Sequence, residues 1–105
     1  KTAGQPKLPW KDRKQSYLKR LSNSYYIEAY LVATADKIHN LIDILNDYHQ
    51  FGDEIWQRFN ASKWDILWYY RAVFDLIKNE PIPKDLKHQL ESLIRRLKAI
   101  VAMNS

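Results

Sequence analysis

The chain has 105 residues, which is enough for one compact domain and too few for two. It contains no cysteine, so disulfides, zinc–thiolate sites and thiol nucleophiles are excluded, and a reducing compartment such as the cytoplasm fits. The formal net charge is +5, with residues 1–20 and 81–105 mainly basic and residues 21–80 richer in acidic side chains. This layout indicates an anionic partner near the ends and a polar or metal-binding site between them, or else ordinary solvated helix surface.

The spacing of apolar residues predicts an all-α fold. Residues 1–9 have two prolines and no periodicity, and we expect an arm or loop there. Helical periodicity predicts long helices over 10–21, 26–48, 62–78 and 84–102 and a short one over 53–59. The cluster Ser22-Asn23-Ser24 should stop the first helix and supply a cap for the second, and Ser62 should cap the next long helix. No apolar run reaches the ~20 residues of a membrane span, so we expect no membrane partner.

The helix predicted over 26–48 has two different faces. At 100° per residue, its apolar arc should consist of Leu31, Ile38, Leu41, Ile42 and Leu45. The opposite stripe changes along the helix from small apolar residues to polar ones: Ala29, Val32, Ala33, Asp36, Asn40, Asp43 and Asp47. Asp36 follows the most hydrophobic segment of the chain, where a carboxylate is costly to bury without a partner. The position of Asp36 therefore predicts a functional rather than an incidental carboxylate.

Asp36 and Asn40 form the candidate site that spacing alone suggests. Four residues apart on a helix, they should lie one turn apart on the same face. A hard divalent cation needs a carboxylate oxygen, and a neighbouring amide can hold a water molecule or a substrate hydroxyl without adding charge. The alternative is solvated helix surface. Lys37 and His39 should point away from this stripe, with His39 a surface or packing residue.

Other well-known site motifs do not occur in the sequence. The histidines His39, His49 and His88 are far apart, and none forms an H-x-x-x-H, H-E-x-x-H or His-Asp arrangement. The glycines Gly4 and Gly52 stand alone, so there is no glycine-rich phosphate loop and no nucleophile elbow. A self-sufficient histidine metal site is therefore not expected.

Aromatic residues are concentrated between positions 56 and 70. The set Trp56, Phe59, Trp64, Trp68, Tyr69 and Tyr70 could stack on nucleic-acid bases, but helical spacing favours a packed core. Arg58 and Arg71 lie among these rings, and we expect them to stack on rings or to pair with carboxylates.

Four segments carry a resemblance to a known family. Residues 31–40, LVATADKIHN, resemble the A-D-K-x-H-N helix of HD-domain metal-dependent phosphohydrolases, in the branch related to the hydrolase domain of RelA/SpoT guanosine polyphosphate enzymes. Residues 52–60 and 67–71 resemble a G-x-x-x-W-x-R-F-N … L-W-Y-Y-R pattern of that branch, and residues 10–18 resemble its W-x-x-R-K-x-x-Y-L helix. The resemblance covers roughly residues 9–78 and implies an HD-domain-like helical fold.

The resemblance also implies a chemistry. In this family a histidine, a His-Asp doublet and a later aspartate hold a divalent cation, commonly manganese, for the hydrolysis of a phosphoester or pyrophosphate. Asp36 matches the later aspartate and Asn40 matches an asparagine beside metal and substrate. The resemblance further implies that basic residues such as Arg13 and Lys14 could help to hold phosphates. The residues after Asn40 depart from related hydrolases, which often have an arginine or threonine there.

The histidine ligands of the family pattern are missing from this sequence. The chain begins with Lys1 rather than methionine, and we expect it to be the C-terminal part of a single HD-like domain, with the other ligands preceding Lys1. One aspartate cannot fill a coordination shell, so this part alone should contain no catalytic residue and should not turn over a phosphorylated small molecule or nucleotide.

Three hypotheses remain open from the sequence. The first is a truncated phosphohydrolase, which should self-associate through surface left exposed where its other helices packed. The second is a non-enzymatic helical module whose basic ends bind an acidic protein or nucleic acid. The third is a degenerate HD-like domain kept for structural or regulatory contacts.

Overall fold

The computed structural model describes residues 9–103 as four α-helices and one 3₁₀-helix. In chain order these are α1 (Trp10–Ser22), α2 (Ile27–Phe51), η1 (Gly52–Arg58), α3 (Lys63–Ile77) and α4 (Lys84–Met103). No strand occurs within residues 9–103, so the predicted all-α class is confirmed. Apart from Pro9, the arm expected over residues 1–9 lies outside the described residues.

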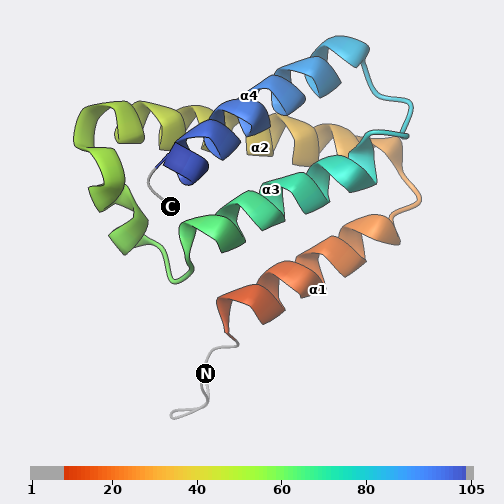
Figure 1. Cartoon of the computed structure of the whole chain (residues 1–105). Helices are drawn as coiled ribbons and strands as arrows, with labels where there is room; N and C mark the ends of the chain where they lie inside the picture. The colour runs from red at the N-terminus through yellow and green to blue at the C-terminus, as the bar shows by residue number, and fades with distance from the viewer. Residues whose placement is uncertain (1–8, 104–105) are drawn as a thin grey trace.

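The helices form a flat arrangement around α3. In Figure 1, α3 lies between α1 on one side and α2 and α4 on the other, and it contacts all three. The longest helix, α2, packs against α4, η1 and α3. The principal extents are 40 × 37 × 19 Å, so the molecule is two helices thick at ~10 Å per helix. None of the helices within residues 9–103 is both long enough and apolar enough to span a bilayer.

The end of α1 differs in part from the prediction. The helix stops at Ser22 as expected. However, the hydroxyls of Ser22 and Ser24 donate to the carbonyls of Lys19 and Arg20 in α1, at 2.8 and 3.3 Å. The N-cap of α2 is Tyr26, and no side chain caps it. The serines therefore close the first helix rather than open the second.

The later boundaries follow from local chemistry. Helix α2 continues beyond its predicted end at Tyr48 to Phe51 and stops where Gly52 takes a φ of 67°, a backbone conformation that glycine adopts without steric cost. At the start of α3, the backbone N–H of Asp65 donates to the Ser62 hydroxyl at 3.1 Å, so the predicted cap is confirmed.

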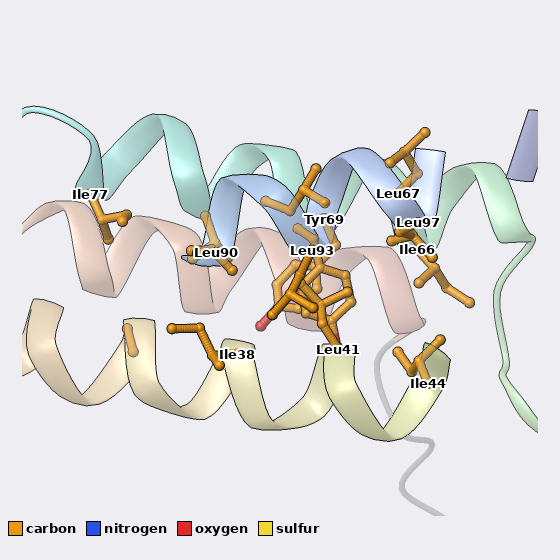
Figure 2. Packing of buried hydrophobic residues seen from close by; sticks show 14 of the residues in the cluster. Ile38, Leu41, Ile44, Ile66, Leu67, Tyr69, Ile77, Leu90, Leu93 and Leu97 are labelled. Atoms are coloured by element: carbon orange, nitrogen blue, oxygen red, sulfur yellow. The ribbon is translucent and has the colours of Figure 1, made fainter. Parts of the chain in front are cut away.

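The core lies between α2, α3 and α4. In Figure 2, Ile38 and Leu41 of α2 point toward Leu90 and Leu93 of α4. The largest fully buried side chains are Leu41, Ile55, Ile66, Ile77, Leu90, Leu97, Val73, Val101 and Thr34. Helix α1 contributes one fully buried residue, Leu21, and otherwise packs through partly buried side chains. The first helix is therefore the one held least by apolar burial.

The buried face of α2 is turned relative to the predicted arc. Ile42, expected in the core, is 38% exposed, whereas Ala33, expected on the opposite stripe, is 3% exposed. Tyr30, Thr34 and Lys37 are buried as well. The hydroxyl of Thr34 donates to the carbonyl of Tyr30 at 2.7 Å, which satisfies its polar group inside the helix. Because α2 is rotated about its axis relative to the prediction, its polar stripe lies at the margin of the core rather than opposite it.

Two adjacent residues of α2 test this orientation. Leu41→Ala should lower the free energy of unfolding by about 2–5 kcal/mol, because Leu41 is fully buried and its removal leaves a cavity. Ile42→Ala removes a side chain that is 38% exposed and should cost about 1 kcal/mol or less. Urea denaturation of both variants measures the difference, and equal losses would contradict the orientation.

Candidate functional site

Asp36 lies on α2 as part of a hydrogen-bonded group. Its side chain is 53% exposed, and its Oδ2 accepts a hydrogen bond from the ammonium of Lys37 at 2.9 Å. The amide Nδ2 of Asn40 donates to the same oxygen at 3.5 Å, so the two residues meet on one face as their spacing predicts. The carboxylate of Asp36 is therefore paired with Lys37, a residue that the sequence analysis expected to point away from it.

The prediction that Lys37 points away from Asp36 is wrong. Its side chain is 7% exposed, and its Nζ lies 4.6 Å from the ring centroid of Tyr17 and 5.4 Å from that of Tyr69. The flexible aliphatic stem of lysine follows apolar surface while the charged end reaches a polar partner. Burial opposes the charge, but hydrogen bonds with Asp36 and Tyr69 outweigh it, so the pKa of Lys37 lies above its ordinary value.

Lys37 belongs to a larger group that we call the cation–aromatic cluster. Its members come from α1, α2 and α3: Trp10, Lys11, Lys14, Tyr17, Lys37, Trp68 and Tyr69. The Nζ of Lys14 lies 4.8 Å from the Tyr69 ring centroid and 5.7 Å from that of Trp10. The Nζ of Lys11 lies 4.8 Å from the Trp68 ring centroid and 3.8 Å from a carboxylate oxygen of Asp65. Cations over ring faces are attracted by the ring quadrupole, and here they join three helices.

Burial and neighbouring positive charges disfavour the protonated form of Lys14. Burial lowers its pKa, the positive charges of Lys37 and Arg13 lower it further, and Asp36 acts in the opposite direction. A bound anion would relieve the repulsion among these three cations. Arg13 itself is exposed on α1, close enough for its charge to act on Lys14.

A cavity of about 360 Å³ opens beside this group, a size typical of small-molecule sites. It is lined by Trp10, Lys14, Asn40, Asp43, Ile44, Asp47, Phe59, Ile66, Tyr69 and Tyr70. Burial raises the pKa of Tyr70 to about 12, so its phenol stays protonated at neutral pH, while the nearby Asn40 side chain acts in the opposite direction. Of the four predicted site residues, Lys14 and Asn40 line the cavity, whereas Asp36 and Arg13 do not.

Other polar predictions have clear outcomes. His39 is 75% exposed, with Nε2 3.5 Å from a carboxylate oxygen of Asp43, and is a surface residue as expected. Arg58 pairs with Asp47 at 3.3 Å and lies 5.3 Å from the ring centroid of Phe51, so both expected roles of its guanidinium are confirmed.

The aromatic set divides between core and surface. Tyr69 and Tyr70 are buried, as the core interpretation predicts. For Trp64 that interpretation is wrong, because its side chain is 48% exposed at the start of α3. Trp64 lies on a different side of α3 from the buried Ile66 and Leu67, which helical spacing alone did not separate.

The two basic segments of the sequence meet on the outer surface of α3. A hollow of about 350 Å³ is lined by Trp64, Leu67, Trp68, Arg71, Ala72, Asp75 and Lys98. Lys11 of α1 lies over the ring of Trp68, and Lys98 of α4 lines the same hollow. We call this surface the tryptophan hollow.

An open groove runs between α1 and α2, with a volume of about 460 Å³. It is lined by Tyr17, Arg20, Leu21, Ser24, Glu28, Ala29, Val32 and Ala33. Val32 is 68% exposed within it, and Tyr25 and Tyr26 beside it are 96% and 75% exposed. Large apolar side chains with this exposure are typical of surfaces that another structure covers.

The chemistry of the site suits part of a metal centre. The carboxylate of Asp36 and the amide of Asn40 offer hard oxygen atoms, which hard divalent cations prefer. Within residues 9–103, no three histidine, aspartate or glutamate side chains lie close enough together to hold a cation. No known protein-family model matches the sequence, and no curated protein matches it either.

Proposed function

We propose that this chain forms part of an HD-type metal-dependent phosphohydrolase that acts on a phosphoester or pyrophosphate of a nucleotide, such as a guanosine polyphosphate. The observation that supports the proposal is that separate segments of the sequence that resemble the family come together in the structure. Residues 10–18, 31–40 and 67–71 carry the resemblance and lie far apart in the sequence, yet they supply all members of the cation–aromatic cluster around Asp36. Phe59, from the fourth segment, lines the adjacent cavity.

Each candidate residue has a distinct role in this proposal. Asp36 would bind the cation, proposed to be manganese, together with a histidine and a His-Asp doublet from polypeptide outside this sequence. A bound divalent cation lowers the pKa of a water molecule and neutralises charge on phosphoryl oxygens. Asn40, between Asp36 and Tyr70, would orient a water molecule or substrate hydroxyl. Lys14 would bind a phosphate from the wall of the cavity, and Arg13 would add longer-range attraction.

The lining of the cavity favours a nucleotide over a simple phosphate ester. Trp10 and Phe59 are partly buried and line the cavity with aromatic surface, and Trp10 packs edge-to-face on the buried Tyr69 with ring centroids 6.0 Å apart. Aromatic walls stack on bases, while a neighbouring lysine and amide supply polar contacts. A planar base and a phosphate could therefore be bound at the same time.

Asp36→Ala tests the proposal in the full natural protein. The variant should lose manganese-dependent phosphohydrolysis by at least 100-fold while keeping its helical circular dichroism, because a metal ligand has been removed from an exposed position. Asp75→Ala is the matched control, since Asp75 is an exposed carboxylate on α3 paired only with Lys78 in the described residues. Full activity in Asp36→Ala would remove Asp36 from the site.

We also propose that the groove between α1 and α2 is covered in the natural protein and that this chain alone self-associates through it. Val32→Glu should shift the chain toward monomer in sedimentation velocity runs, because it places a charge in the apolar groove. Trp64→Glu, on a different exposed surface, should leave the association unchanged. A strictly monomeric chain at high concentration would contradict this proposal.

The tryptophan hollow favours a second candidate function, a non-enzymatic module that binds nucleic acid or an acidic protein. In that case the chain should bind random-sequence nucleic acid in a salt-sensitive manner, and Lys98→Ala should reduce both the affinity and the slope with salt. Lys84→Ala, at the other end of α4, is the control. Absence of binding at low salt would count against the module.

A further inference from the structure

The two oxygens of the Asp36 carboxylate differ in their surroundings. Within residues 9–103, both hydrogen bonds to the side chain end on Oδ2, one from Lys37 and one from Asn40. None of the hydrogen bonds among these residues ends on Oδ1. The Asp36 side chain as a whole is 53% exposed, so the carboxylate is in contact with solvent.

The donor that holds Oδ2 is itself held in place. The Lys37 side chain is 7% exposed, and its ammonium lies between the rings of Tyr17 from α1 and Tyr69 from α3. The pair formed by Lys78 and Asp75 at 3.2 Å is different, because its side chains are 49% and 68% exposed and can separate freely. The pair at Asp36, by contrast, has its lysine in contact with rings from two other helices.

We infer that Lys37 is a positioning residue: confined by Tyr17 and Tyr69, it fixes Oδ2 of Asp36 so that Oδ1 faces a divalent cation in one orientation. The cation in this statement rests on the proposed function, whereas the immobilisation of Asp36 does not.

Two opposing effects decide what the loss of Lys37 would do to cation binding. If its positive charge dominated through repulsion, removing the ammonium would tighten the binding of a cation. If orientation dominated, binding would weaken, since residues that orient a metal ligand are typically worth 10–100-fold in affinity. Asp36 is half exposed, so water and salt screen the repulsion. Orientation should therefore prevail.

The first experiment measures the immobilisation in this chain. Side-chain scalar couplings from nuclear magnetic resonance should show one Asp36 rotamer in the unmodified chain and rotamer averaging in Lys37→Met, which keeps a buried aliphatic stem. Lys11→Met removes another lysine from an aromatic ring without touching Asp36 and should leave its couplings unchanged. If Lys37→Met fails to fold, Tyr17→Leu opens one side of the lysine's enclosure and should also loosen Asp36. A fixed Asp36 rotamer in the folded variant would overturn the inference.

The second experiment measures manganese affinity in the full natural protein by electron paramagnetic resonance. Lys37→Met should weaken binding by about 10–100-fold, Lys37→Arg should restore most of it, and Lys11→Met should leave it unchanged. Equal or tighter binding in Lys37→Met would overturn the positioning role toward the cation. If the unmodified protein binds no manganese, the proposed function fails, and with it the role toward a cation, while the rotamer measurement still decides whether Lys37 fixes Asp36.

Discussion

The arrangement of α1, α2 and α3 depends on the buried ammonium of Lys37. A charge taken out of water costs several kcal/mol unless it is paired. Here the compensation comes from the Asp36 carboxylate at 2.9 Å and from the faces of Tyr17 and Tyr69. Because Tyr17 belongs to α1 and Tyr69 to α3, the ammonium on α2 contacts side chains of both neighbouring helices. One polar contact thus couples the position of three elements.

This coupling matters most for α1. Leu21 is its single buried residue, so apolar burial alone holds the helix weakly. Its other attachments are edge-to-face rings, such as Tyr17 with Tyr69 at 6.2 Å between centroids, and lysines placed over aromatic faces. The same contacts that attach α1 also bring Lys14 to the cavity and its charge toward Asp36. The contacts that attach α1 to the other helices are therefore also the contacts that form the candidate site.

Periodicity predicts the helices well because each long helix has an apolar stripe of its own. Periodicity does not predict which side of α2 is buried, because the helices that pack against α2 decide this. Thr34 is fully buried, and its hydroxyl is satisfied by the carbonyl of Tyr30, whereas Ile42 is 38% exposed. Residue type alone ranks these two positions in the opposite order.

The same limitation explains why Lys37 was missed. A spacing argument follows the direction of the Cα–Cβ bond and treats lysine as a surface residue, while the aromatic rings that receive the ammonium come from distant segments. A signal was nonetheless present, because Lys37 stands at helical spacing from Thr34 and Leu41, two of the most buried residues of α2. A lysine at this position in a buried stripe indicates that its ammonium has a partner inside the fold.

Stability alone gives no reason for charged residues at the junction of three helices. Well-packed apolar side chains of similar volume are often as stabilising as a buried ion pair, or more so. The junction nevertheless contains Lys37 with Asp36, and Lys14 with a lowered pKa, beside a cavity with an amide and aromatic walls. The ammonium of Lys37 also contacts rings of α1 and α3, so this charge has a structural role at the junction as well. In the proposed function, Lys14 and Asn40 would contact the ligand from the cavity wall, while Lys37 and its two tyrosines hold the neighbouring helices together.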